Sequence, residues 1–356
     1  MFKLAPSGAG WTESVLYSFQ GGSDGLFPSG GLTSPIGGKL YGTTELGGNN
    51  GSGTVFSITP QGSEAVVHAF SGGDGLFPVG TLVKVGGTFY GTTASSAYSI
   101  TPQGTETVLH YFNPPFDANG DGSSPDGGLV ADAAGNLYGT TFYGGNLNCL
   151  SQSVGEPNFG CGTVFELTPP TSPGGSWGEI ILFAFPSNTK YGANPDGELA
   201  IAGSGTLVGT TATGGSSANC PAVPPNPSGA APSCGTVFKI VQSQGETVIH
   251  NFHGRDGAYP TGKLASVGGK LFGTTEFGGT GACPATSTTP AGCGTVFSIT
   301  PQGLFTVVYS FQGGSDGAGP VSGLINIGGE LYGTTTTGGG TGCGGYGCGT
   351  VFEITP

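Results

Sequence analysis

The stretch Asn136-Leu-Tyr-Gly-Thr-Thr141 decides the fold, because its Gly-Thr-Thr ending recurs at regular places in the chain. The tag begins at residues 42, 91, 139, 209, 273 and 333. Successive copies are 49, 48, 70, 64 and 60 residues apart. Self-similarity at such a period indicates a tandem repeat of about 45 residues that carries insertions of variable length.

Four short apolar runs make up the clearest repeat, which begins at Pro125. They are Gly128-Leu-Val-Ala-Asp132, Asn136–Thr141, Gly162-Thr-Val-Phe-Glu-Leu-Thr168 and Glu179-Ile-Ile-Leu-Phe-Ala-Phe185. Gly, Pro, Asn and Asp separate the runs, which is the pattern of antiparallel strands joined by turns. We term these strands a, b, c and d.

A single four-stranded sheet cannot bury both of its faces, so the repeats must stack on one another. We therefore predict an all-β fold: a six-bladed β-propeller of four-stranded antiparallel blades, in one domain over residues 1–356. An open solenoid is the alternative, although its repeats are usually shorter. The predicted repeats are 20–70, 71–112, 113–185, 186–252, 253–311, and 312–356 together with 1–19.

The two ends of the sequence share the last predicted blade. Residues 2–6 resemble strand c and residues 12–19 resemble strand d, whereas residues 312–356 supply strands a, b and c. We expect the N- and C-terminal strands to pair and close the propeller. Strand c then occurs seven times, so residues 1–7 either hang free or compete with residues 350–356 for one position.

Composition excludes several classes of function. The chain has 21 acidic and 8 basic residues and a net charge of −13, without a cluster of Lys and Arg, so we expect no nucleic-acid partner. No apolar run approaches the roughly 18 residues of a membrane span, so we expect no membrane insertion by this segment. Met1 leads directly into a repeat element, and we expect a leader and a C-terminal anchor to lie outside this sequence.

The eight cysteines occur in pairs within b–c loops. The pairs are Cys149 with Cys161, Cys220 with Cys234, Cys283 with Cys293, and Cys343 with Cys348. Even number and local pairing predict four disulfides in an oxidising compartment, and hence a secreted or cell-surface protein. Zinc knuckles are the alternative, but only the last pair approaches their spacing.

The repeat Pro-x₂-Gly-Leu-x₅-Gly-x-Leu-Tyr-Gly-Thr-Thr…Gly-Thr-Val-Phe-x-Ile-Thr-Pro resembles the GloVer (Gloeo/Verruco) tandem repeat of bacterial surface proteins. It is also similar in outline to NHL-type propeller repeats. The resemblance covers nearly the whole chain. It implies export, often with a C-terminal anchor, and it implies no known reaction.

An Asp-Gly turn recurs in the d–a loops. We identify its members as Asp24, Asp74, Asp121, Asp196, Asp256 and Asp316. One interpretation is a tight turn in which Asp caps backbone N–H groups. The other is an acidic rim that binds cations or sugar hydroxyls.

One copy of this turn resembles a calcium loop. Asp117, Asn119, Asp121 and Ser123 place oxygen ligands at alternate positions, and Asp126 can replace the missing acid at the twelfth position. We predict Ca²⁺ as the one possible cofactor, with an Asx-rich turn as the alternative.

The histidines are weaker candidates for a site. His68, His110 and His250 share a d-strand position with Tyr17, Phe183 and Tyr309, which favours packing. His253, Arg255 and Asp256 form a polar cluster that is unique to one repeat.

Near-identical repeats favour a non-catalytic binding or surface-scaffold propeller over an enzyme. Its partner would be a glycan or an extracellular protein, contacted by the b–c and d–a loops. The alternatives are a polysaccharide-acting lyase or hydrolase at the channel mouth, and a structural protein that self-associates through its terminal strands.

Overall fold

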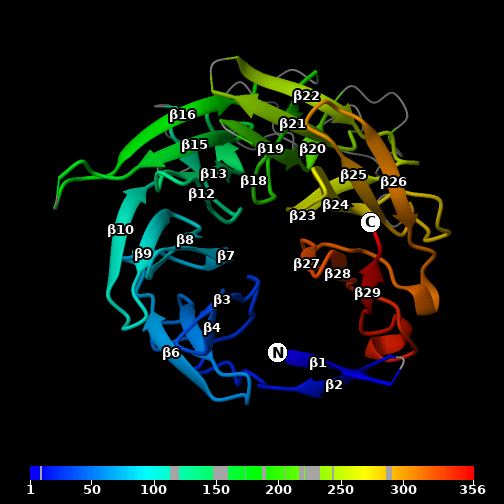
Figure 1. Ribbon diagram of the computed structural model, residues 1–356, viewed down its shortest axis with the longest axis horizontal. Coiled ribbons are helices and arrows are strands. Elements are labelled where there is room, and N and C mark those ends of the chain that lie inside the picture. Colours follow the sequence, from blue (N-terminus) through cyan, green and yellow to red (C-terminus); the bar gives the residue numbers. More distant parts are fainter. Residues whose placement is uncertain are drawn as a thin grey trace. The chain divides into compact units, whose positions relative to one another are not determined.

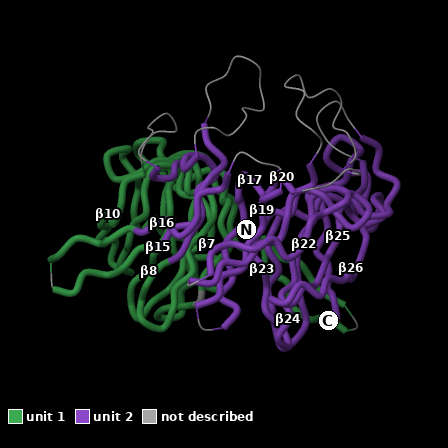
Figure 2. The backbone as a smooth tube through the Cα atoms, turned by 90° about the horizontal axis from the view of Figure 1, so that it is seen from above, with its two compact units in different colours: residues 1–112, 124–137, 167–179 green, residues 113–123, 138–166, 180–356 purple. Residues whose placement is uncertain are grey.

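The computed structural model describes residues 1–8, 10–112, 120–146, 159–172, 174–186, 190–203, 205–215, 220, 233–242, 244–285 and 291–356. Its ordered elements are β-strands, apart from two 3-10 turns, η1 (Gly314–Asp316) and η2 (Cys343–Gly345). The chain packs as two compact units, one of residues 1–112, 124–137 and 167–179, and one of residues 113–123, 138–166 and 180–356 (Figure 2). Among the described residues, no helix has the length and hydropathy of a membrane span.

Six antiparallel sheets follow one another along the chain (Figure 1). In the first five the spatial order of strands is the sequence order a, b, c, d, and the sixth has strands a, b and c. The first two blades are β3 (Thr33–Ile36), β4 (Lys39–Thr44), β5 (Thr54–Ile58) and β6 (Glu64–Ala69), then β7 (Pro78–Val85), β8 (Thr88–Thr93), β9 (Ser96–Ile100) and β10 (Glu106–Tyr111). The third and fourth are β12 (Val130–Ala131), β13 (Leu137–Thr141), β15 (Thr163–Thr168) and β16 (Gly178–Ala184), then β18 (Ala200–Ile201), β19 (Thr206–Thr211), β21 (Thr236–Val241) and β22 (Gly245–Asn251). The last two are β23 (Ala258–Val267), β24 (Lys270–Phe277), β25 (Thr295–Ile299) and β26 (Phe305–Ser310), then β27 (Ile325–Ile327), β28 (Glu330–Thr334) and β29 (Val351–Ile354). These sheets are the blades of a six-bladed β-propeller, and the predicted fold class is confirmed.

Three two-stranded sheets complete the described strands. They are β1 (Phe2–Ser7) with β2 (Gly10–Val15), β11 (Gly122–Ser123) with β14 (Tyr143–Gly144), and β17 (Gly192–Ala193) with β20 (Thr213–Gly214). The last two link a d–a loop to the end of strand b within the third and fourth repeats.

Burial along the blades explains the apolar b and c strands. Every residue of β5 and of β25 is buried, so both faces of strand c are covered. The d strands β6 and β26 contain no buried residue. Strand c of these two blades is therefore mostly apolar, with the sequence Thr-Val-Phe-Ser-Ile, because neither of its faces meets water.

The Gly of the Gly-Thr-Thr tag allows an aromatic ring of strand c to lie against strand b. A Cβ on Gly42 would lie 2.7 Å from Phe56 Cζ, and one on Gly273 would lie 2.6 Å from Phe297 Cζ. Gly209 faces Phe238 in the same way. The tag thus begins with glycine because the aromatic ring of strand c occupies the space that a side chain would need.

The two threonines of the tag make different hydrogen bonds. The first reaches the following repeat, as when Thr92 Oγ1 donates to the carbonyl of Gly127 at 2.9 Å. The second is bonded to the hydroxyl that opens strand c. These pairs are Thr44–Thr54, Thr93–Ser96, Thr141–Thr163, Thr211–Thr236, Thr275–Thr295 and Thr335–Thr350, with oxygens 2.8 to 2.9 Å apart. One threonine therefore joins blades, and the other closes the b–c loop.

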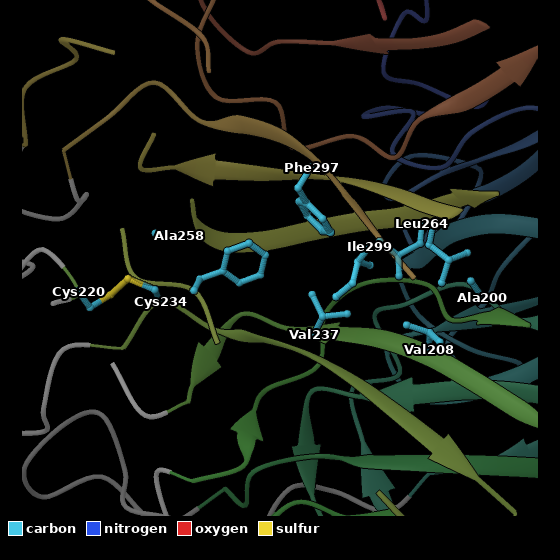
Figure 3. Packing of buried hydrophobic residues seen from close by; sticks show 11 residues of the cluster. Ala200, Val208, Cys220, Cys234, Val237, Ala258, Leu264, Phe297 and Ile299 are labelled. Atoms are coloured by element: carbon cyan, nitrogen blue, oxygen red, sulfur yellow. A yellow bond between two sulfur atoms is a disulfide. The ribbon is translucent and has the colours of Figure 1, made fainter. Parts of the chain in front are cut away.

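A buried apolar cluster fills the space between the fourth and fifth blades (Figure 3). Val208 and Val237 contribute from the fourth blade, and Phe297 and Ile299 from the fifth. The Cys220–Cys234 disulfide belongs to the same cluster and lies near Ala258. The disulfide is thus part of the packing between these two blades.

The N-terminal strands resolve which c-like strand pairs with the N-terminal d strand. β1 pairs along β2, with Leu4 opposite Glu13, in the register that places Ile58 opposite Glu64 between β5 and β6. Residues 16–19 continue beside the first blade, where Phe19 meets Phe56 at a ring distance of 5.1 Å. Phe70 meets Tyr98 of the second blade in the same way, so residues 16–19 occupy a d-strand place.

The C-terminal sheet has three strands, β27-β28-β29, and β1 and β2 form a sheet of their own. The predicted closing pair between terminal strands is not among the strand pairs of the described residues, and closure stays a prediction. Residues 1–7 do not hang free, since β1 occupies the edge of β2 that residues 350–356 would need.

Candidate functional site

Four of the d–a loops are each held to the b–c loop of the preceding repeat by a backbone hydrogen bond. The donor is the N–H of the residue before a recurrent proline. The pairs are Phe77 to Ser52 at 3.0 Å, Asn194 to Cys161 at 2.8 Å, Tyr259 to Cys234 at 2.9 Å and Gly319 to Cys293 at 3.0 Å. In three of the four, the acceptor is the carbonyl of the second cysteine of a predicted pair.

The glycine after that cysteine explains the recurrent Cys-Gly-Thr-Val-Phe motif. Gly294 has φ +92°, and a Cβ there would lie 2.5 Å from both Pro320 Cδ and the carbonyl of Thr275. Gly235 meets Pro260 at 2.7 Å. Glycine is needed because the proline of the next repeat packs directly against this backbone, which has a positive φ.

The residue before the proline has one backbone conformation and many side chains. Phe27, Phe77, Ser124, Asn194 and Tyr259 have φ of 56°, 54°, 53°, 55° and 56°, and Gly319 has φ of 67°. A non-glycine residue in this left-handed region costs about 1–2 kcal/mol. Phe27 is nevertheless 57% exposed and Phe77 38% exposed. The repeats therefore present different side chains, including exposed aromatics, from one strained loop position, which we call the pre-proline position.

The Asp of the Asp-Gly turn binds the d strand that precedes it. Asp74 Oδ2 lies 2.9 Å from His68 Nε2, and Asp256 Oδ2 lies 3.0 Å from His250 Nε2. Where the d strand carries tyrosine, its hydroxyl donates: Tyr17 to Asp24 at 2.9 Å and Tyr309 to Asp316 at 2.8 Å. Each carboxylate also accepts a backbone N–H, from Gln20, Ser71, His253 or Gln312. We call this arrangement the d-strand–Asp pair.

These hydrogen bonds settle the ionisation of the pairs. Burial opposes the charged form of Asp74, but the N–H of Ser71 and the ring of His68 outweigh it, so the pKa of Asp74 is lowered. The same balance, with burial opposed chiefly by Gln20 and Tyr17, lowers the pKa of Asp24. The hydrogen bond to Asp24 raises the pKa of Tyr17 to about 12, so Tyr17 remains a donor at neutral pH.

A glutamate from the next d strand approaches two of these pairs. Glu106 brings a carboxylate oxygen to within 4.8 Å of the His68 and Asp74 ligand atoms. Burial and then the charge of Asp74 raise the pKa of Glu106 to about 7. Burial and then the charge of Asp24 likewise raise the pKa of Glu64. In the fifth repeat this position is Phe305, whose ring stacks on His250 at 3.6 Å.

Asp24, Asp74, Asp256 and Asp316 thus lie where the repeat predicts, although their carboxylates are held by the preceding d strand. The structure corrects the prediction that Asp196 belongs to the Asp-Gly turn of the fourth repeat. The glycine that faces the second threonine of the tag is Gly192, which faces Thr211 as Gly75 faces Thr93. The residue before Gly192 is Tyr191, and Asp196 follows the recurrent proline instead, where burial raises its pKa.

The His253–Arg255–Asp256 cluster separates in the structure. Asp256 turns to His250 and to the backbone of His253. The side chains of His253 and Arg255 are exposed.

The predicted calcium loop is described only in part, since Asp117 and Asn119 lie outside the described residues. Asp121 Oδ1 accepts the N–H of Gly122 at 3.0 Å. Ser123 Oγ is buried without a hydrogen-bond partner among the described residues. The N–H of Asp126 donates to the carbonyl of Ser124. Calcium binding at this loop stays a prediction.

Three of the four predicted disulfides are confirmed: Cys220–Cys234, Cys283–Cys293 and Cys343–Cys348. Cys149, the predicted partner of Cys161, lies outside the described residues. No described cysteine is free. Such disulfides are typical of proteins in oxidising compartments.

Sequence reasoning treated the d-strand histidines as packing residues and missed their pairing with Asp. The signal was present in the spacing, because the Asp follows His by six residues at 68 and 250, and follows Tyr by seven at 17 and 309. The pre-proline position was also missed, since a residue that varies between repeats looks unconstrained in sequence.

The fold and these recurrent contacts define the chain as a repeat-built β-propeller whose blades are joined at the d–a and b–c loops. The model of the Gloeobacter/Verrucomicrobia repeat matches residues 1–152 and 226–356. The chain belongs to this family, as the sequence resemblance predicted. A search of curated proteins gives no match.

Solved structures share the fold at low sequence identity. A catalytically inactive virginiamycin B lyase from Staphylococcus aureus, solved with quinupristin, has 13% identity and a TM-score of 0.54 over 94% of this chain and 81% of its own. The PQQ-bound aldose sugar dehydrogenase of Streptomyces coelicolor has 15% identity and a TM-score of 0.51 over 93% and 95%. The calcium-binding protein regucalcin of Agrobacterium tumefaciens has 12% identity and a TM-score of 0.52 over 93% and 92%. At these identities the likeness shows the fold alone.

Proposed function

We propose that the protein is a secreted or cell-surface, non-catalytic binding propeller that contacts a glycan or an extracellular protein through its d–a loops. The pre-proline position carries this proposal. Its backbone is the same in each repeat, but its side chain is Phe, Phe, Ser, Asn or Tyr. A position selected only for its φ would favour Gly, as at Gly319, or Asn.

The chemistry of this position suits recognition. Exposed aromatic rings such as Phe27 and Phe77 bury a large area against a ligand and lose little conformational freedom. Neighbouring repeats add amide and hydroxyl groups at the same position, which can orient a polar ligand. The disulfides and the family membership support the extracytoplasmic placement.

Fluorescently labelled protein on a glycan array, followed by biolayer interferometry with candidate surface proteins, tests the proposal. The matched variant is Phe27→Asn with Phe77→Asn, because Asn194 already occupies this backbone conformation. We expect the variant to keep the wild-type melting temperature within a few degrees and to lose binding. Equal binding by wild type and variant would refute the role of the pre-proline position.

The enzyme alternative has structural neighbours that are enzymes, and a polysaccharide cleavage screen with the same two proteins tests it. The self-association alternative has one specific observation. Strand β29 pairs only with β28 among the described strands, and a cavity of about 340 Å³ runs beside it, lined by Phe311, Phe352 and Ile354 among others. Light scattering that shows a monomer at all concentrations would exclude strand addition at this edge.

A further inference from the structure

We infer that His68, Asp74 and Glu106 form a binding site for a divalent transition-metal ion such as Zn²⁺ between the first and second blades. His68 lies on β6, Asp74 in the following d–a loop, and Glu106 begins β10 of the next repeat. One nitrogen and two carboxylate oxygens lie within 4.8 Å of one another, and all three residues are half-buried. This site is separate from the calcium loop predicted from sequence and from the pre-proline position.

The ligand set and its dimensions suit zinc. Imidazole nitrogen and carboxylate oxygen bind Zn²⁺ at about 2.0–2.2 Å, which places tetrahedral ligands about 3.4 Å apart. The His68 and Asp74 atoms are 2.9 Å apart, and no pair in the cluster exceeds 4.8 Å. Rotation of the Glu106 side chain and small shifts of His68 and Asp74 would bring these distances to the tetrahedral value. Two carboxylates also balance the charge of a divalent ion.

The surroundings orient the ligands toward one point. Asp74 Oδ1 accepts the N–H of Ser71 at 2.7 Å and its hydroxyl at 3.0 Å, so Oδ2 is the oxygen turned to His68. Such outer contacts are what fixes a metal-binding carboxylate. Glu106 Oε1 is buried without a hydrogen-bond partner among the described residues. A buried carboxylate oxygen facing another carboxylate is unfavourable unless a cation lies between them.

Other repeats serve as comparisons within the same chain. Tyr17 replaces His68 beside Asp24 and Glu64, and its protonated hydroxyl is a hydrogen-bond donor that does not bind zinc at neutral pH. At the junction of the fourth and fifth repeats, His250 and Asp256 are present but Phe305 takes the place of the glutamate. The complete ligand set at His68 is therefore not required by the fold of the repeat.

The experiment uses the oxidised full chain, stripped with a chelator and titrated with ZnCl₂ in competition with a chromogenic chelator. His68→Tyr is the principal variant, because Tyr17 shows that tyrosine keeps the hydrogen bond to the Asp. Glu106→Gln removes one ligand charge. His250→Tyr is the matched control at a repeat that lacks the third ligand.

We expect wild type and His250→Tyr to bind one zinc equivalent that His68→Tyr and Glu106→Gln lack. Zinc should raise the melting temperature of wild type and leave that of His68→Tyr unchanged. Co²⁺ should give visible d–d absorption in wild type and His250→Tyr, and none that depends on this site in His68→Tyr or Glu106→Gln. Wild-type protein without a zinc equivalent, or His68→Tyr with wild-type affinity, would overturn the assignment.

Discussion

Replacement of Thr275 by valine removes the second hydroxyl of one tag without changing the size of the side chain. Thr275 Oγ1 accepts the N–H of Thr295 at 3.1 Å, bonds to the hydroxyl of Thr295 at 2.8 Å and donates to the carbonyl of Phe277 at 3.0 Å. Both threonines are fully buried. Valine removes the hydrogen bonds of the side chain to the N–H of Thr295 and to the carbonyl of Phe277, and the loss of such a partner costs about 1–3 kcal/mol for a buried group.

We expect Thr275→Val to lower the free energy of unfolding by about 3 kcal/mol. With an unfolding entropy of about 2.1 cal/mol/K per residue, this corresponds to a fall in melting temperature of about 4 °C. Calorimetry on wild type, Thr275→Val and Thr275→Ser measures the effect. Serine keeps the hydroxyl, so Thr275→Ser should lose much less stability than Thr275→Val.

A double-mutant cycle with Thr295→Val sharpens the test. Because the two hydroxyls bind each other, the double variant should lose less stability than the sum of the single variants. A Thr275→Val protein within about 1 kcal/mol of wild type would refute the reasoning, since the loss of a buried N–H partner alone should exceed that amount.

Three further predictions follow from the joints between blades and from burial. Gly294→Ala should cost about 2–4 kcal/mol, because its Cβ would meet Pro320 at a positive φ; urea unfolding measures this, and a neutral result would show that Pro320 can move away. Glu246→Gln should raise the urea midpoint at pH 8 and leave it unchanged near pH 4. Burial raises the pKa of Glu246 to about 7, partly opposed by Lys190, so the folded state binds this proton more tightly than the unfolded state and stability falls as pH rises from about 4.5 to 7. The opposite dependence on pH would contradict this account. Replacement of Cys283 and Cys293 by serine should cost about 2–3 kcal/mol, read from the melting temperature with and without reductant; a reductant effect in the variant equal to that in wild type would assign the loss to the other disulfides.

The blades could be predicted from the sequence because the patterns that define a blade lie within a single repeat. The Gly-Thr-Thr tag, the apolar c strand and the paired cysteines lie within one repeat, and repetition makes them visible. The role of the second threonine could be inferred only from the structure, because its partner opens strand c beyond a loop of variable length.

Contacts between repeats were the part that sequence could not supply. His68 and Glu106 belong to different repeats, and only the folded structure brings both of them near Asp74. Asp196 was misaligned because Pro-Asp-Gly looks like the Asp-Gly turn, whereas the space beside Thr211 identifies Gly192 as the true equivalent. The pre-proline φ is likewise a property of the backbone that a varying residue does not reveal.

The hydrogen bond from the pre-proline N–H to the preceding b–c loop has a consequence for how such chains can diversify. Its length is 3.0 Å where the acceptor is Ser52, in a loop without cysteine, and 2.9 and 3.0 Å where the acceptors are Cys234 and Cys293. The disulfides that end at these two cysteines span 14 and 10 residues of sequence. This hydrogen bond therefore forms in the same way whatever the number of residues in the preceding b–c loop. Foreign peptides grafted between Cys220 and Cys234 should be displayed without disturbing the neighbouring blade, which makes this loop a natural place for inserted sequence to change during evolution and in engineering.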